Sequence, residues 1–157
     1  MNVQRAGLIP MKGRLHGGWL ARVVLGICFV YLGLNKALSP ADFLKAVHQY
    51  EGLKNTLYLT WIAALLPWFE VFCGVALLVG FWIRGAAFGT FGMLLFFSAM
   101  VLQRALQIRG ATGVGFCEIR FDCGCGNGEV LVCLKLMENA VLVFLAGMLS
   151  LRRFAVL

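Results

Sequence analysis

Four apolar segments dominate this chain, and each is long enough to cross a lipid bilayer. They cover approximately residues 19–38, 60–83, 85–106 and 130–151. The hydrocarbon core of a bilayer is about 30 Å thick and a helix rises about 1.5 Å per residue, so about 20 apolar residues suffice. Backbone groups in lipid must be hydrogen-bonded within their own segment, which favours helices. The sequence therefore predicts an all-α polytopic membrane protein built as a bundle of four transmembrane helices.

The composition supports a lipid environment over an aqueous one. Hydrophobic residues make up 61% of the 157 residues and charged residues only 13%, against about 45–50% and about 25% in soluble domains. The net charge is +7, but the basic residues flank the apolar segments, a pattern that contacts lipid headgroups and argues against nucleic-acid binding. We expect a single domain over residues 1–157, with a basic leader at 1–18 that is not a secretory signal.

The connections between the segments differ in length, and this sets the predicted topology. The second and third segments meet at a tight turn near Arg84 and Gly85, whereas the other two connections contain about twenty residues each. Four spans place both long loops on one side of the membrane and the termini on the other. Basic residues divide almost evenly between the sides, but the terminal side has no acidic residue. We take the termini as cytosolic and the long loops as extracytoplasmic.

The first long loop predicts a short helix at the membrane surface. Ser39 is a suitable N-cap, with Pro40 at the first helical position. Apolar residues recur at helical spacing at Phe43, Leu44, Val47, Tyr50 and Leu53. We expect this amphipathic helix to lie on the interface and to end near Gly52.

Four cysteines lie in or beside the second long loop. They are Cys117, Cys123, Cys125 and Cys133. Zinc sites favour paired cysteines with about two to four residues between them, and this loop has neither that spacing nor a histidine, so we assign no metal. Two alternatives stay open: a redox-active Cys123–Cys125 pair, and structural disulfides or free thiols in a glycine-rich turn. An extracytoplasmic loop favours at least one disulfide.

A Cys123–Cys125 disulfide would close a very small ring, and strain makes a disulfide easier to reduce. Easily reduced disulfides are typically catalytic or regulatory. Lys135, at the start of the fourth span, is a nearby cation that would favour a thiolate. Membrane catalysts that pass electrons from thiols to quinone generally need a second thiol pair, and Cys117 and Cys133 are the candidates for it.

Glu70 is an ionisable residue near the middle of the second span. A charge at that depth is costly and usually faces the bundle interior. Two interpretations stay open: an acid that transfers protons or serves a quinone, and a neutral carboxyl that holds helices together by hydrogen bonds. The candidate partners are Asn35, Ser98 and Gln103.

Three polar residues of the fourth span, Lys135, Glu138 and Asn139, share one helical face. Their spacing predicts a polar seam in which Lys135 pairs with Glu138. Cys28 and Cys73 lie among apolar neighbours inside spans, and we expect them to pack as small hydrophobic residues.

Several short motifs occur in the order found in a known membrane family. They are Gly33-x-x-Lys36, Pro40-x-x-Phe43, and Leu66-Pro67-Trp68-Phe69-Glu70 followed by Gly74 and Gly80. With a cysteine-bearing loop before the last span, they make residues 17–150 resemble the DoxX/MauE family. That family consists of small four-helix membrane proteins associated with thiol redox chemistry.

The resemblance implies a place in a thiol–disulfide redox system of the bacterial inner membrane. MauE-like members are associated with the maturation of disulfide-rich periplasmic enzymes, alongside thioredoxin-like partners. Many carry Cys-x-Cys followed by Phe-Gly, whereas here Cys123-Gly124-Cys125 is followed by Gly126-Asn127. The implied activity, if the chain is an enzyme, is that of a membrane thiol–disulfide oxidoreductase in which Cys123 and Cys125 exchange disulfides with an extracytoplasmic thioredoxin-like partner or client.

Supporting roles follow for two polar residues, Glu70 and Lys135. The sequence assigns no cofactor-binding residues, and a membrane quinone is the candidate electron acceptor. A second function stays open, that of a non-catalytic accessory subunit in a larger membrane complex. The replacement of Phe-Gly by Gly126-Asn127 favours it, as does the aromatic third span, "FGTFGMLLFFSAM", which has more bulky apolar surface than a four-helix bundle needs.

Overall fold

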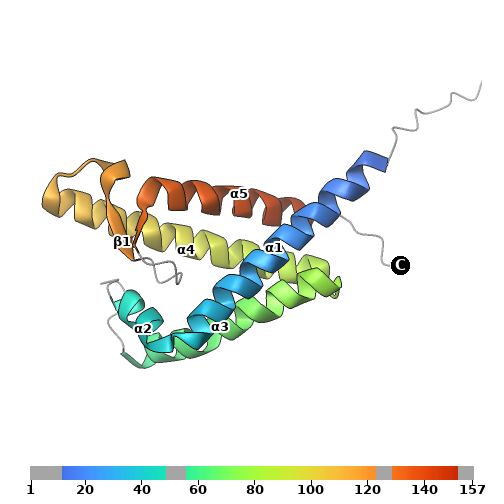
Figure 1. The fold of residues 1–157 in the computed structure, drawn as a ribbon, viewed down its shortest axis with the longest axis horizontal. Helices are drawn as coiled ribbons and strands as arrows, with labels where there is room; N and C mark the ends of the chain where they lie inside the picture. The colour runs from blue at the N-terminus through green and yellow to red at the C-terminus, as the bar shows by residue number, and fades with distance from the viewer. Residues whose placement is uncertain (1–11, 49–55, 123–128, 152–157) are drawn as a thin grey trace, which may run out of the picture.

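The computed structural model describes residues 12–48, 56–122 and 129–151, and these are mostly helical (Figure 1). The helices are α1 (Lys12–Leu38), α2 (Pro40–His48), α3 (Thr56–Val79), α4 (Ile83–Thr112) and α5 (Val132–Leu151). A short 3-10 helix, η1 (Phe116–Glu118), and the strands β1 (Arg120–Asp122) and β2 (Glu129–Leu131) connect α4 to α5. The helical prediction is confirmed, but the all-α class missed this small antiparallel hairpin.

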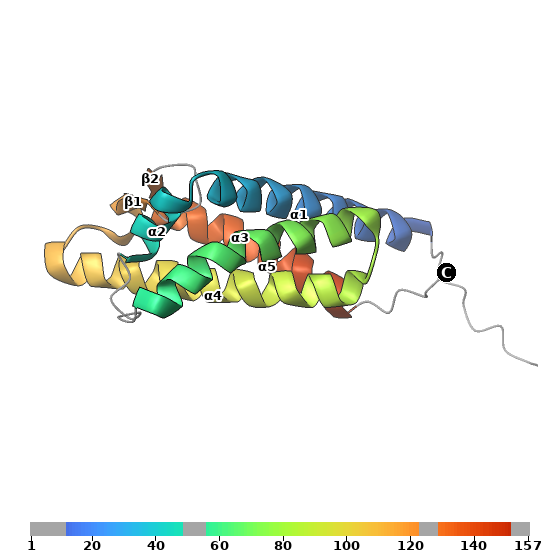
Figure 2. The ribbon, with the colours of Figure 1, turned by 90° about the horizontal axis from the view of Figure 1, so that it is seen from below.

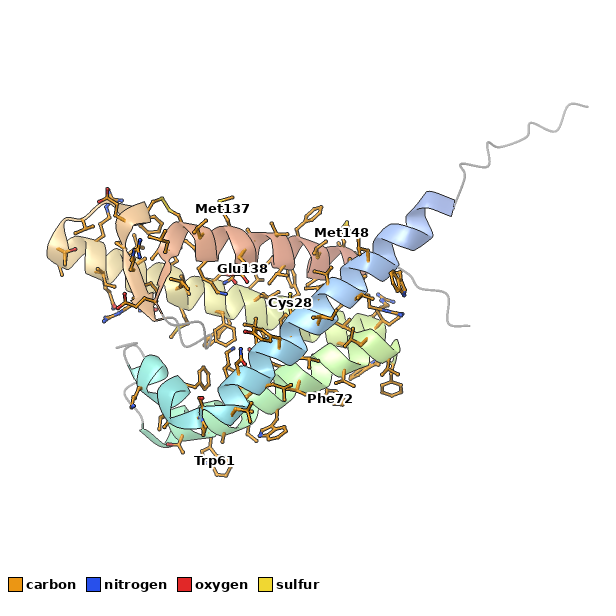
Figure 3. The ribbon with its side chains drawn as sticks, in the orientation of Figure 1. Cys28, Trp61, Phe72, Met137, Glu138 and Met148 are labelled. Atoms are coloured by element: carbon orange, nitrogen blue, oxygen red, sulfur yellow. A yellow bond between two sulfur atoms is a disulfide. The ribbon has the colours of Figure 1, made fainter. Side chains whose placement is uncertain are left out.

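Three of the described helices are long and apolar enough to cross a membrane: Gly18–Leu38 within α1, the whole of α4 and the whole of α5. α3 contributes a shorter apolar stretch, Ala63–Val79. Large hydrophobic side chains are exposed on the outer surfaces of these helices, among them Trp61, Phe72 and Met137 (Figure 3). Exposed apolar surface of this extent marks contact with lipid, and the chain is an integral membrane protein.

The four long helices form two closely packed pairs, α1 with α3 and α4 with α5. Figure 1 shows α1 crossing α4 and α5 diagonally, and Figure 2 shows α2 and the strands at one end of the bundle and the α3–α4 turn at the other. Both long connections therefore lie at the same end. A buried apolar core that includes Leu25, Leu77, Leu94, Leu142 and Leu149 joins the two pairs.

The α1–α3 pair depends on glycine at its closest points. A Cβ atom added at Gly33 would lie 2.8 Å from the carbonyl oxygen of Pro67, and one added at Gly74 would lie 2.8 Å from that of Gly26. No larger residue fits where two backbones approach so closely. The glycines of α1 and α3 therefore permit the close packing of this pair.

The turn between α3 and α4 falls earlier than predicted. α3 ends at Val79, not at residue 83, and the turn covers residues 80–82 and not Arg84 and Gly85. Gly80 and Trp82 both have positive φ, at 87° and 47°, and this backbone reversal ends one helix and begins the next. Glycine adopts a positive φ without steric cost. Gly80 was therefore a sequence signal for the turn, although the apolar run continues past it.

Several other helix limits differ from the predicted spans, and α3 begins at Thr56 and not at residue 60. α1 begins at Lys12 and not at residue 19, because a helix need not end where the hydrocarbon ends. α4 continues to Thr112, past the predicted end at Leu106, and α5 begins at Val132 and not at residue 130. The hairpin explains both of these, since it packs on the last turns of α4 and its second strand occupies residues 129–131.

α2 confirms the helix predicted in the first long loop. It begins at Pro40, and the carbonyl oxygen of Ser39 accepts a hydrogen bond from the Phe43 N–H at 3.1 Å. Phe43 is buried and packs with Ala63 and Leu66 of α3. The predicted end near Gly52 lies outside the described residues.

Candidate functional site

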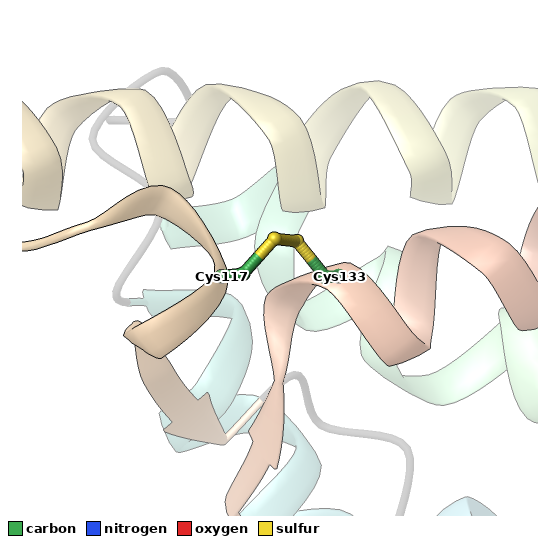
Figure 4. The surroundings of a disulfide bond; sticks show 2 residues. All are labelled: Cys117 and Cys133. Carbon is green, nitrogen blue, oxygen red and sulfur yellow. A yellow bond between two sulfur atoms is a disulfide. The ribbon is translucent and has the colours of Figure 1, made fainter.

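The second long loop is closed by a disulfide between Cys117 and Cys133 (Figure 4). Their Cα atoms are 5.0 Å apart and the two residues are separated by 16 positions in the sequence. Cys117 belongs to η1 and is exposed, whereas Cys133 is in the first turn of α5 and is half-buried. The structure therefore joins the two cysteines that the sequence offered as a second thiol pair.

The β1–β2 hairpin holds this disulfide at the start of α5. The strands pair Arg120 with Leu131, Phe121 with Val130, and Asp122 with Glu129. The Val132 N–H donates a hydrogen bond to the Ile119 carbonyl oxygen at 3.1 Å, which extends the pairing toward the cysteines. Cys123 and Cys125 lie outside the described residues, and the chain that carries them connects the paired residues Asp122 and Glu129.

An apolar cluster anchors the hairpin to the extended end of α4. Ile119, Phe121 and Val132 are buried together with Val101 and Ala105 of α4. Burying a large apolar side chain contributes about 1.5–3 kcal/mol, so this cluster fixes the hairpin on the bundle. The disulfide is thus held against the helices and is not at the tip of an independent loop.

Glu70 forms a buried ion pair with Lys36. The Lys36 Nζ donates a hydrogen bond to Glu70 Oε1 at 2.6 Å, and the two side chains are 3% and 4% exposed. The predicted partners of Glu70 were therefore wrong. Lys36 follows Gly33 by three residues and lies on the same helical face, the one on which α1 approaches α3 most closely.

Two of the partners predicted for Glu70, Ser98 and Gln103, are placed elsewhere. Gln103 is exposed, and Ser98 accepts a hydrogen bond from Asn139. Sequence reasoning missed Lys36 as the partner of Glu70. The Gly33-x-x-Lys36 spacing contained the signal, because Gly33 marks the face of α1 that contacts α3 and Lys36 lies on that face.

Two aromatic rings complete the surroundings of Lys36. Its Nζ lies 4.4 Å from the ring centroid of Phe97 and 5.5 Å from that of Phe43, within the range of cation–π attraction. Contacts of this one side chain therefore join α1, α2, α3 and α4. The second carboxylate oxygen of Glu70, Oε2, is buried without a hydrogen-bond partner in the described part of the chain.

α5 contributes a second polar group on the same side of the bundle interior. Lys135 Nζ donates to Glu138 Oε2 at 3.0 Å, and Asn139 Nδ2 donates to Ser98 Oγ at 3.2 Å. The predicted Lys135–Glu138 pair is confirmed; Lys135 is buried and Glu138 is 51% exposed. Both ion pairs have members buried inside the bundle, and we call the two together the interior polar region.

The remaining cysteines are free thiols inside the bundle. Cys73 is buried and Cys28 is half-buried and packs against the apolar core. Figure 3 shows Cys28 on the part of α1 that faces α5, the helix that carries Glu138. Over residues 12–48, 56–122 and 129–151, no group of three or more histidine, cysteine or acidic side chains is arranged to hold a metal ion.

A family model described as methylamine utilisation protein MauE matches residues 15–152. The chain belongs to the MauE family. The match covers all five helices and the cysteine-bearing connection, so the resemblance found over residues 17–150 holds for almost the whole chain. No curated protein and no solved structure matches.

Proposed function

We propose that this MauE-family protein is the membrane component of a thiol–disulfide redox system. The observation that carries the proposal is the Cys117–Cys133 disulfide, held at the end of the bundle directly before the buried Lys135. Cys117 is exposed, and we expect its sulfur to be the one that an external thiol attacks. Cys123 and Cys125 lie in the connection enclosed by this disulfide and are proposed as the pair that meets the partner protein.

The proposed exchange conserves electrons and protons at every step. A thiolate of the client, or of a thioredoxin-like partner, attacks a Cys123–Cys125 disulfide and forms a mixed disulfide. The client's second thiolate breaks that bond, so the client leaves oxidised and Cys123 and Cys125 remain as thiols. These thiols then reduce the Cys117–Cys133 disulfide by the same two attacks. The electron pair has moved from the client to the second thiol pair.

The interior polar region is proposed to serve the reoxidation of that second pair. A membrane quinone is the proposed acceptor, and when bound it would accept the two electrons and two protons of the dithiol. Glu70 fits the reduced, quinol form of such a group, because its Oε2 is buried with no hydrogen-bond partner among the described residues and would accept a hydrogen bond from a quinol hydroxyl, while Lys36 holds Oε1 in place. Lys135 is proposed as a supporting cation near the cysteine loop.

The proposed topology has four spans, with the apolar stretch of α3 as the fourth. The termini would lie in the cytosol and the cysteine loop outside it, in the bacterial inner membrane. Support comes from the placement of both long connections at one end of the bundle (Figure 2). An extracytoplasmic loop would also have the oxidising surroundings that disulfides require.

The first experiment is a redox titration of the loop cysteines in native membranes, read by an alkylating mass tag. We expect both pairs to interconvert at potentials above about −250 mV, in the range of known exchangers. Cys125→Ser should accumulate mixed disulfides through Cys123. The matched control is Cys28→Ala with Cys73→Ala, which should leave the titration unchanged. Thiols that stay locked or stay free at all potentials would exclude the exchange mechanism.

A second candidate function, the accessory subunit, is favoured by a groove between α4 and α5. The groove has a volume of about 590 Å³ and is almost wholly apolar, with Phe91, Leu95, Val143 and Phe144 in its lining. Such a groove on a membrane-facing surface would seat a helix of a larger complex. Purification of the protein in native lipid particles tests the subunit function. A partner protein that co-purifies in stoichiometric amount, and is lost from the Phe144→Ala variant, would favour it.

A further inference from the structure

The end of the bundle opposite the cysteine loop carries two arginines beside the α3–α4 turn. The Arg22 guanidinium lies against Gly80, because a Cβ atom added there would be 3.0 Å from Arg22 Nη1. Arg22 is half-buried, and its Nε is buried without a hydrogen-bond partner among the described residues. Arg84 is exposed, and its Nε donates to the Ser150 carbonyl oxygen at 3.4 Å. The Arg22 guanidinium therefore lies against the turn, and Arg84 follows the turn by two residues in the sequence.

This chain supplies no aspartate or glutamate side chain to that end of the bundle. The sequence has no aspartate or glutamate in residues 1–41, 71–117 or 139–157, and these ranges include α1, the turn, all of α4 and the last part of α5. The same end adds Lys12 and Arg14 at the start of α1. No acidic side chain of this chain therefore neutralises the two arginines, and an external anion is free to approach them.

The turn also lies where a membrane meets water. The apolar stretch of α3 ends at Val79, and the span of α4 begins at Ile83. Between them, Phe81 and Trp82 are 66% and 70% exposed. Exposed aromatic residues at the ends of membrane helices are characteristic of the headgroup region, so the anion available to Arg22 and Arg84 is the phosphate of a lipid.

We propose that the turn binds the phosphate of an anionic phospholipid between Arg22 and Arg84. The planar guanidinium group donates to phosphate oxygens in pairs, a geometry that a lysine ammonium lacks. The acyl chains would lie on the exposed apolar surface that begins at Val79 and Phe88. This proposal is independent of the thiol–disulfide function, because the site is at the other end of the bundle from the disulfide.

Trp82 offers a reporter within the proposed site. The assay uses a protein in which the other tryptophans, Trp19, Trp61 and Trp68, are changed to Phe. Lipids brominated in the upper part of their acyl chains quench the fluorescence of Trp82, and the extent of quenching reports which lipid lies beside it. The full chain is reconstituted into vesicles of phosphatidylcholine with increasing phosphatidylglycerol, one lipid brominated at a time. We expect phosphatidylglycerol to be preferred at Trp82. Each arginine should contribute roughly fivefold to the preference, the factor expected for one basic residue near an anionic surface.

Three variants decide the outcome. Arg22→Gln and Arg84→Gln should each reduce the preference by that factor, whereas Arg109→Gln, an exposed basic residue at the opposite end of α4, should leave it unchanged. Arg84→Gln is informative even if Arg22→Gln does not fold, because the Arg84 side chain is exposed. Equal quenching by both lipids, or a preference unaffected by Arg84→Gln, would overturn the proposal. Stronger competition by inorganic phosphate than by chloride at equal ionic strength would assign the site to free phosphate instead.

Discussion

The Lys36–Glu70 pair makes a quantitative prediction, because both members are buried and each is the other's charged partner. At the observed 2.6 Å separation, the Coulomb attraction is about 6 kcal/mol with an effective dielectric constant of about 20. Most of this only offsets the cost of removing two charges from water, so the net contribution of the intact pair to stability is small. Removal of one partner is a different case, since the other charge stays buried.

We therefore expect Lys36→Met and Glu70→Gln each to lower the free energy of unfolding by about 3–5 kcal/mol. Lys36→Met should be at the upper end of this range, because it also removes the attraction to the Phe97 ring, worth up to about 2 kcal/mol in a desolvated site. The double variant Lys36→Met with Glu70→Gln should recover most of the loss, because no charge remains without a partner.

The measurement is unfolding of the purified protein by increasing sodium dodecyl sulfate, followed by tryptophan fluorescence. The matched control is Arg109→Gln, which removes an exposed charge of α4 and should change the free energy of unfolding by no more than about 0.5 kcal/mol. Single variants that lose less than the control, or a double variant whose loss equals the sum of the two single losses, would refute the view of Lys36 and Glu70 as a coupled buried pair.

Three further predictions concern packing and the disulfide. Cys133→Ser should destabilise the protein by about 3 kcal/mol, the entropy of closing a loop of this length, and the loss should vanish when both proteins are measured under reducing conditions. Gly74→Ala should cost about 1–3 kcal/mol in the same unfolding assay, because its methyl group would meet backbone atoms of α1; Gly92→Ala, with open space at that position, should cost less than about 0.5 kcal/mol. Phe121→Ala should cost about 3 kcal/mol or more, and hydrogen exchange should show the loss of protection concentrated in β1 and β2.

The helices could be predicted from the sequence because lipid leaves the backbone few alternatives. A run of apolar residues must satisfy its own hydrogen bonds, so the existence and order of α1, α3, α4 and α5 followed from hydropathy alone. Their limits did not, since hydropathy does not register a reversal such as the one at Gly80 and Trp82. The hairpin was also out of reach, because its strands contain three residues each and depend on packing against Val101 and Ala105.

The candidate site was predicted in part, and the division has a physical cause. The Lys135–Glu138 pair is local, so helical spacing alone predicted it. The partners of Glu70 and Cys117 depend on how separate elements meet, through the crossing of α1 on α3 and the register of β1 on β2. A single sequence does not contain that geometry explicitly, so Glu70 was found without its partner Lys36, and Cys117 and Cys133 were named together only as a candidate pair.

The first turns of α5 link the disulfide to the interior polar region. Cys133, Lys135 and Asn139 belong to this one helix and contact, respectively, Cys117 of η1, Glu138 of the same helix and Ser98 of α4. A helix moves as a unit over so short a distance, so release of Cys133 from Cys117 would alter the constraint on Lys135 and on its ion pair with Glu138. The state of the cysteine pair and the position of the Lys135–Glu138 ion pair are therefore physically connected through α5.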